Sequence, residues 1–325
     1  MMAMTNGSSV AARSLFALCA VVVLYAAVLI LGGVGAILDA CYRVGFSGAV
    51  ALLLLSLTNL ALRFVRWFVL LGCGRKGVGI GRLIWVYLSG FAFSISPGKL
   101  GEVFRGVLLK RCGVSHEVNF SLFVCERALD LIAVLAMAAI GTLYVSDFGG
   151  VYVFVPATAM LVTFVLVLRT GMFDRLHKGT RDASSRLLRF IHFVSGALAL
   201  VRHSLFSRRA AIGLLLGLGA WSASAFGLSI IVQSQSYEVG FLQAVGIFAL
   251  SMLGAALAGV VGGVGGAESV MVLGLTAAGI LLPEAIAVTM ISRVTTIGVS
   301  VSVGVFALFV AARACREKGL GGEEV

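Results

Sequence analysis

Residues 210–232 read AAIGLLLGLGAWSASAFGLSIIV and contain no charged side chain. An α-helix rises 1.5 Å per residue, so about 20 apolar residues cross the roughly 30 Å hydrocarbon layer of a bilayer. The rest of the chain has the same character, because its 325 residues are 60% hydrophobic and 12% charged, with a mean hydropathy of +1.09. Soluble domains are about half apolar and a quarter charged. The sequence therefore predicts an integral membrane protein.

Apolar stretches of similar length recur along the chain. Six are predicted to cross the bilayer as full helices: 14–37, 49–72, 118–145, 151–168, 210–232 and 285–312. Two more, 83–111 and 241–281, are interrupted and predict broken helices or re-entrant hairpins. Glycine permits positive φ and proline removes a helical donor. The structural breaks are therefore expected at Pro97, Gly98, Gly101, Gly262, Gly263 and Gly265.

The positive charge of the loops predicts an orientation. Residues 169–209 carry nine Lys/Arg against two Asp, and the loop 72–82 and the C-terminal tail are also basic. Because cytoplasmic loops are enriched in Lys and Arg, we expect these segments and both termini on the cytoplasmic side of the cell membrane. The net charge of +11 thus indicates an anionic lipid surface as partner, and no nucleic acid.

The same loop charges suggest how the interrupted segments are arranged. The first would enter and leave the membrane from the cytoplasm, and the second from outside, which predicts an inverted repeat. If each interrupted segment instead crossed the membrane twice, the basic loops would still lie on the cytoplasmic side. Loop charge therefore does not distinguish re-entrant hairpins from full crossings. Either way we expect an all-α helix bundle forming one membrane domain over 1–325, with halves of about 1–168 and 169–325. A helical apolar stripe predicts a cytoplasmic amphipathic helix over about 184–206.

Acids and arginines within the apolar segments repeat at a fixed spacing. Glu102 follows the first glycine-rich break and precedes Arg127 by 25 residues, and Glu268 stands in the same relation to Arg293. A charged side chain at the centre of a membrane helix costs about 2.5–3.5 kcal/mol on insertion scales. Such residues are expected to face the bundle interior, near the bilayer midplane, with a partner or a wet cavity.

Further charges lie near these pairs. Asn59, Arg63 and Arg66 share one helical face, and free N–H groups at a broken helix end would favour an anionic headgroup. The candidate substrate-binding residues are Arg63, Arg66, Lys99, Glu102, Arg105, Glu126, Arg127, Asp130, Glu268 and Arg293. A purely structural ion-pair network is the alternative interpretation, with Arg66 reaching the cytoplasmic interface beside Trp67.

Other kinds of site receive little support. The six cysteines are scattered without a CxxC motif, and the four histidines fall in or beside predicted cytoplasmic segments. The glycine clusters match neither the dinucleotide pattern nor the phosphate-binding loop of NTPases. We therefore expect no metal, no cofactor and no catalytic residues, and a protein that is not an enzyme.

Two motifs resemble the signatures of a known family. The first is Ser96-Pro97-Gly98-Lys99-Leu100-Gly101-Glu102 with Arg105, followed by Glu126-Arg127-x-x-Asp130. The second is Val261-Gly262-Gly263-Val264-Gly265-Gly266-Ala267-Glu268 with Arg293. Both are similar to motifs of the flippase-like family named after the transmembrane region of lysylphosphatidylglycerol synthase, although Val261 stands where that family often has proline and Ala267 where it often has a basic residue.

The resemblance spans nearly the whole chain and implies translocation of lipids or lipid-linked compounds. It does not imply lipid synthesis, because the aminoacyl-transferring part of the synthases is a separate soluble domain. The leading hypothesis is a flippase-like protein for an anionic or polyprenyl-linked lipid. The alternatives are a secondary transporter for a soluble anion, an intramembrane enzyme, and a non-catalytic accessory subunit that works with pathway enzymes.

Overall fold

The computed structural model describes residues 34–72, 78–94, 105–110, 113–142, 151–180, 185–258 and 265–316. Every regular element within these ranges is helical, which confirms the predicted all-α class for them. The elements are α2 (Val34–Leu71), α3 (Ile80–Ser89), the 3-10 helix η2 (Gly90–Phe93), α4 (Arg105–Lys110), α5 (His116–Thr142), α6 (Val151–Arg169), α7 (Met172–Gly179), α8 (Arg186–Leu205), α9 (Arg208–Ser234), α10 (Phe241–Ala258), α11 (Gly266–Ala277), α12 (Leu282–Arg293), the π-helix η4 (Val294–Gly298) and α13 (Val299–Arg316).

Four helices in the described part of the chain are long and apolar enough to cross a membrane. They are α2, α6, α9 and the continuous helix from Leu282 to Ala311, at the places predicted for 49–72, 151–168, 210–232 and 285–312. α5 lies at another predicted span, 118–145, but it carries three charged residues in its middle. The remaining span, 14–37, lies almost entirely outside the described residues, so the count of six stays a prediction.

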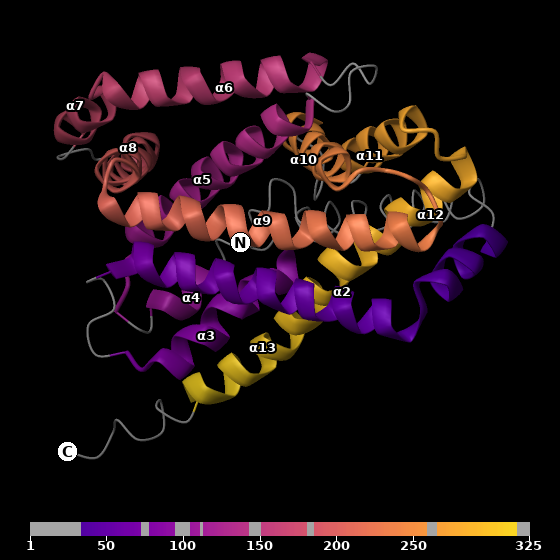
Figure 1. The fold of residues 1–325 in the computed structure, drawn as a ribbon. Helices are drawn as coiled ribbons and strands as arrows, with labels where there is room; N and C mark the ends of the chain where they lie inside the picture. The colour runs from indigo at the N-terminus through magenta and orange to yellow at the C-terminus, as the bar shows by residue number, and fades with distance from the viewer. Residues whose placement is uncertain are drawn as a thin grey trace, which may run out of the picture.

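The long helices form one packed bundle (Figure 1). α2 and α9 lie side by side, α5 packs on the other side of α9, and α12 crosses both α2 and α9. The largest core cluster joins apolar side chains of α2, α5, α9, α10 and α12. α6 lies at the edge, where only 11% of its apolar window is buried inside the protein, so its outer faces are suited to lipid contact.

The start of α2 differs from the sequence-based expectation. The predicted spans 14–37 and 49–72 imply a connection over 38–48, whereas the chain is helical from Val34 onward and bends at Gly45. Gly45 has a φ of 65°, a conformation that glycine adopts without steric cost. Arg43 remains at the helix surface, where its guanidinium lies 3.7 Å from Glu284. Two helical segments of α2 thus meet at the non-helical residue Gly45, with no longer loop between them.

The structure describes helices on both sides of the interruption in each segment. The first gives α3 and η2, then residues 95–104 outside the described part, then α4. The second gives α10 and α11, which pack against each other on either side of residues 259–264, also outside the described part. Gly265 opens α11 with a φ of 90°, which only glycine adopts readily.

α8 packs beside α5, and the short helix α7 packs on α8. α8 occupies the place of the amphipathic helix expected over 184–206 and contacts α5 and α7. Ala197 and Val201 are completely buried there, whereas Leu187 and Phe190 are exposed near the start of α8. The exposed apolar part is suited to the headgroup region of a membrane surface.

The last long helix contains a π-helical turn. η4 follows Arg293 directly and joins α12 to α13 without a break. α12 contacts α2, α9 and α11, whereas α13 contacts α3 and η2. At Gly304 of α13, a Cβ atom would collide with the backbone of Phe91 and Ala92, so this helix approaches η2 with no side chain between them.

α5 and α10 cross at two glycines. A Cβ atom on Gly246 would lie 2.5 Å from the Cα of Gly141, so the two backbones touch. We expect Gly246→Val to force the helices apart and to destabilise the protein by at least about 1–3 kcal/mol, the usual cost of overpacking. Thermal unfolding in detergent would measure this loss. Gly81→Val is the control, because a Cβ there has no atom within 4 Å, and equal stability of the two variants would contradict the crossing.

Candidate functional site

Charged residues from α2, α4 and α5 meet inside the bundle. On α2, Arg63 and Arg66 lie one turn apart and both face α5. On α5, Glu126, Arg127 and Asp130 occupy consecutive turns in the middle of the helix. With Arg105 of α4 they form what we call the arginine–carboxylate cluster: Arg63, Arg66, Arg105, Glu126, Arg127 and Asp130.

Asp130 is the centre of this cluster. Its Oδ1 lies 2.5 Å from Arg66 Nη1, and its Oδ2 lies 3.0 Å from Arg127 Nη2 and 3.8 Å from Arg63 Nη2. The indole N–H of Trp221 in α9 donates to Oδ1 at 2.8 Å. One carboxylate therefore connects α2, α5 and α9, and it is only 9% exposed.

Glu126 organises the other side of the cluster. Its Oε2 lies 2.5 Å from Arg105 Nη2, and its Oε1 lies 3.7 Å from Arg66 Nη2. The hydroxyl of Tyr87 donates to Oε1 at 3.3 Å. The guanidinium of Arg105 also stacks against aromatic rings, 4.9 Å from the centroid of Tyr87 and 5.5 Å from that of Trp67. Arg66 therefore lies within reach of both carboxylates and does not reach the interface, contrary to the snorkelling alternative.

Small residues on α9 make room for Arg66. A Cβ on Gly217 would lie 3.0 Å from its Nη1, and one on Gly213 would lie 3.5 Å from its Cγ. In the structure these glycines let a long charged side chain run along the neighbouring helix to Asp130.

Arg63 is the least satisfied member of the cluster. It is only 6% exposed, and within the described part of the chain neither its Nε nor its Nη2 makes a hydrogen bond. Its guanidinium faces the rings of Phe91 at 5.1 Å and Trp221 at 5.9 Å. A buried donor without a partner costs about 1–3 kcal/mol, and more when it is charged. Arg63 thus has hydrogen-bonding capacity that the described residues do not satisfy.

The cluster has an excess of positive charge. Among the described side chains it contains four arginines and two carboxylates, a formal excess of two. Buried charge in a bilayer requires compensation. Of the remaining predicted residues in this half, Lys99, Glu102, Pro97, Gly98 and Gly101 lie outside the described residues.

The second predicted acid and arginine are in direct contact. Arg293 Nε donates to Glu268 Oε1 at 2.6 Å, and both residues are buried. Glu268 Oε2 also accepts the backbone N–H of Gly265 at 2.7 Å, so the carboxylate closes the first turn of α11. The 25-residue spacing thus identified a contact here, whereas Arg127 is bonded to Asp130 and its expected partner Glu102 is outside the described part. Gly262 and Gly263 are outside it too.

Aromatic residues are the part of the site that the sequence did not predict. Tyr87, Phe91 and Trp221 contact the charged groups through hydrogen bonds or ring faces. Each is an aromatic residue inside an apolar segment, which is also what an ordinary core residue looks like. Their sequence positions alone therefore carry no signal that could have separated them from the core.

No group of three or more His, Cys, Asp or Glu that could hold a metal occurs in the described residues.

Comparison with known families gives one match over most of the chain. The model of the family described as "Lysylphosphatidylglycerol synthase TM region" matches residues 10–304, which include both charged sites. No curated protein matches the sequence.

Proposed function

Because the chain belongs to the lysylphosphatidylglycerol synthase TM region family, we propose that it binds the anionic headgroup of a lipid or lipid-linked compound within the bilayer and moves it across. The observation that carries this proposal is Arg63, a buried guanidinium with two nitrogens that make no hydrogen bond to any described residue. Phosphate offers several acceptor oxygens, and the planar guanidinium can bind two of them at once.

The rest of the cluster supports an anionic ligand. Its excess of two positive charges would be reduced by a bound phosphate, whereas a cation would increase the repulsion. Arg66, Arg105 and Arg127 are each within 2.5–3.0 Å of a carboxylate, so their role is to hold the cluster in place and to supply positive potential. In this proposal Lys99 attracts the headgroup, and Glu102 and Glu268 balance the arginines.

The proposal includes the topology. Six full spans and two re-entrant hairpins would form an inverted repeat in one domain over 1–325, in the cell membrane, with both termini in the cytoplasm. Two observations support it: Gly265 interrupts the second segment with a φ of 90°, and Glu268 after it contacts Arg293 in the next helix. The action is non-covalent, so it needs no cofactor, and its partners are anionic or polyprenyl-linked lipids and enzymes of the same pathway.

Replacement of Arg63 tests the proposal. In proteoliposomes, we expect Arg63→Met to slow headgroup translocation by about 10- to 100-fold, as expected for the loss of ~1.5–3 kcal/mol of hydrogen bonding to a charged group. Arg63→Lys should retain part of the activity, because it keeps the charge but not the fork of donors. A fluorescent anionic lipid protected from an external quencher would report translocation.

The control is Arg43→Met, on the same helix. Arg43 has a 45% exposed side chain at 3.7 Å from Glu284, far along α2 from the cluster, and its loss should leave translocation unchanged. Mass spectrometry of lipids that co-purify with each variant would show whether the ligand is a lipid. Full translocation by Arg63→Met, or equal loss in Arg43→Met, would refute the role of Arg63. Uptake of a soluble anion without lipid translocation would favour a solute transporter instead.

A further inference from the structure

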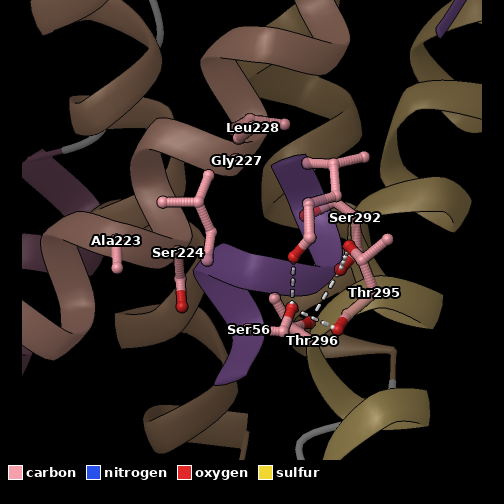
Figure 2. A pocket seen from close by; sticks show the side chains of 10 residues that line it. Ser56, Ala223, Ser224, Gly227, Leu228, Ser292, Thr295 and Thr296 are labelled. Carbon is pink, nitrogen blue, oxygen red and sulfur yellow. Dashed lines mark hydrogen bonds between the residues drawn. The ribbon is translucent and has the colours of Figure 1, made fainter. Parts of the chain in front are cut away.

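A small hydroxyl-lined pocket lies where α2, α9 and the α12–η4 junction meet (Figure 2). Its volume of about 10 Å³ is close to what one water molecule occupies. Five of the residues around it carry hydroxyl groups: Ser56, Ser224, Ser292, Thr295 and Thr296. Hydroxyls are uncommon so close together among spanning helices, because each polar group must find a partner in the bilayer.

The hydroxyl groups leave their oxygen lone pairs available. Ser56 donates to the carbonyl of Thr295 at 2.7 Å or of Leu52 at 2.9 Å, and Thr296 donates to that of Ser292 at 2.7 Å. Figure 2 shows Ser56 beside Thr295 and Thr296, with the bonds from Ser56 to Thr295 and from Thr296 to Ser292 as dashed lines. Since each proton goes to the backbone, the oxygens can accept hydrogen bonds from water or another donor. The pocket therefore offers hydrogen-bond acceptors to a water molecule within the bundle.

Polar contacts continue from this pocket towards the arginine–carboxylate cluster. Asn59 donates to Ser224 Oγ at 3.1 Å and to the carbonyl of Ala220 at 2.6 Å. On α9, Trp221 is the next residue after Ala220, and its indole reaches Asp130. On α2, Arg63 is one turn beyond Asn59, so it lies about 10 Å along the helix from Ser56.

One lining residue of the pocket stands next to the other charged site in the sequence. Ser292 lines the pocket, and the adjacent residue Arg293 forms the ion pair with Glu268. The pocket thus lies between two charged groups that belong to different helices. We call the intervening residues the polar seam: Ser56, Asn59, Ser224, Ser292, Thr295 and Thr296.

Small residues line the α9 side of the seam. Ala223, Ser224 and Gly227 face α2 there, and a Cβ on Gly227 would lie only 3.3 Å from Leu52 Cδ2. A larger side chain would therefore fill the space. The pocket exists because α9 carries no bulky group at these positions.

We propose that the polar seam is the hydrated constriction through which the headgroup passes between the arginine–carboxylate cluster and the Glu268–Arg293 pair. This rests on the proposed function and adds the route. The two charged sites bind the anion at different depths. Water held by the seam hydroxyls hydrates the headgroup between them and lowers the cost of moving a polar group through the bundle.

Cysteine labelling tests the route. In a variant whose six native cysteines are replaced by serine, Ser224→Cys and Ser56→Cys are treated in proteoliposomes with a small cationic methanethiosulfonate reagent, which reacts with hydrated thiolates. We expect both to react. Labelling should reduce translocation at least about tenfold relative to the same variant before treatment, because the attached group fills the constriction. Leu57→Cys, adjacent on α2 and exposed on the outside of the bundle, should stay unlabelled.

The outcomes separate this inference from the proposed function. If neither seam cysteine reacts, or if labelled Ser224→Cys translocates at its unlabelled rate, the seam is not the route, even where Arg63→Met remains inactive. Reaction of Leu57→Cys at the same rate would also overturn the inference, since hydration would not be confined to the seam. Labelled protein that still retains lipid through Arg63, but no longer moves it, supports the inference. If either Ser224→Cys or Ser56→Cys fails to fold, labelling of the other variant tests the route.

Discussion

Asp130→Ala is expected to prevent the protein from reaching a stable fold. Asp130 compensates Arg66 at 2.5 Å and is the nearest carboxylate to Arg63 among the described residues. Removing one partner of a buried ion pair typically costs about 3–5 kcal/mol, because the remaining charge stays desolvated. That is a large fraction of the total stability of most proteins, which is about 5–15 kcal/mol. We therefore expect little folded protein after detergent extraction, measured by size-exclusion chromatography and thermal unfolding.

A control and a rescue make this test specific. Asp174→Ala removes a carboxylate that also pairs with an arginine, Arg202 at 2.7 Å, but both side chains are about a third exposed, so the loss should stay below ~1 kcal/mol. Asp130→Leu combined with Arg66→Leu removes charge of both signs, and apolar replacement of a buried pair is often neutral. The double variant should fold better than Asp130→Ala. Normal stability of Asp130→Ala alone would show that the cluster does not depend on this carboxylate.

Glu268→Gln is expected to destabilise α11 and to stop translocation. Both carboxylate oxygens of Glu268 accept hydrogen bonds, one from Arg293 Nε–H and the other from the backbone N–H of Gly265. An amide has only one oxygen, so its NH₂ group would face a donor at one of the two positions. The buried guanidinium then loses its carboxylate, at a cost of about 3–5 kcal/mol. Thermal unfolding and the proteoliposome assay measure the two effects.

Glu284→Gln is the matched control for this variant. Glu284 also lies near an arginine, Arg43 at 3.7 Å, but its side chain is 24% exposed, and it accepts the hydroxyl of Tyr237. We expect Glu284→Gln to change stability and translocation only slightly. Addition of Arg293→Gln to Glu268→Gln should restore part of the stability, since no unpaired charge remains, but not the translocation. Wild-type activity of Glu268→Gln would exclude a role for the Glu268–Arg293 pair in transport.

The sequence predicted those features that depend on local composition. Span length follows from hydropathy, so α6 and α9 begin and end within three residues of the predicted positions. Of the predicted breaks, Gly265 is described and has a positive φ that few other residues adopt, whereas the first break and Gly262 and Gly263 stay predictions. The pairing of Glu268 with Arg293 followed from a repeated spacing. The start of α2 was wrong, since Gly45 permits a kink inside a helix as readily as a loop between helices.

The sequence could not predict how the helices are rotated against one another. Asp130 was one of ten candidates, and nothing in its local pattern showed that Arg63, Arg66 and Arg127 would all lie within 3.8 Å of it. The role of Gly217 depends on a side chain from α2, which lies far away in the sequence. The polar seam has the same origin, because its hydroxyls come from three helices and look individually like the ordinary serines and threonines of membrane helices.

The π-helical turn after Arg293 makes one long helix behave as two. An α-helix turns by about 100° per residue, so a wider turn with one extra residue shifts the angular position of everything that follows it. Arg293 can therefore point to α11 while Gly304, farther along the same continuous helix, lies against η2. α12 packs on α9 and α11, α13 packs on α3 and η2, and both contact α2. A twist at η4 would therefore change the alignment of α12 relative to α13.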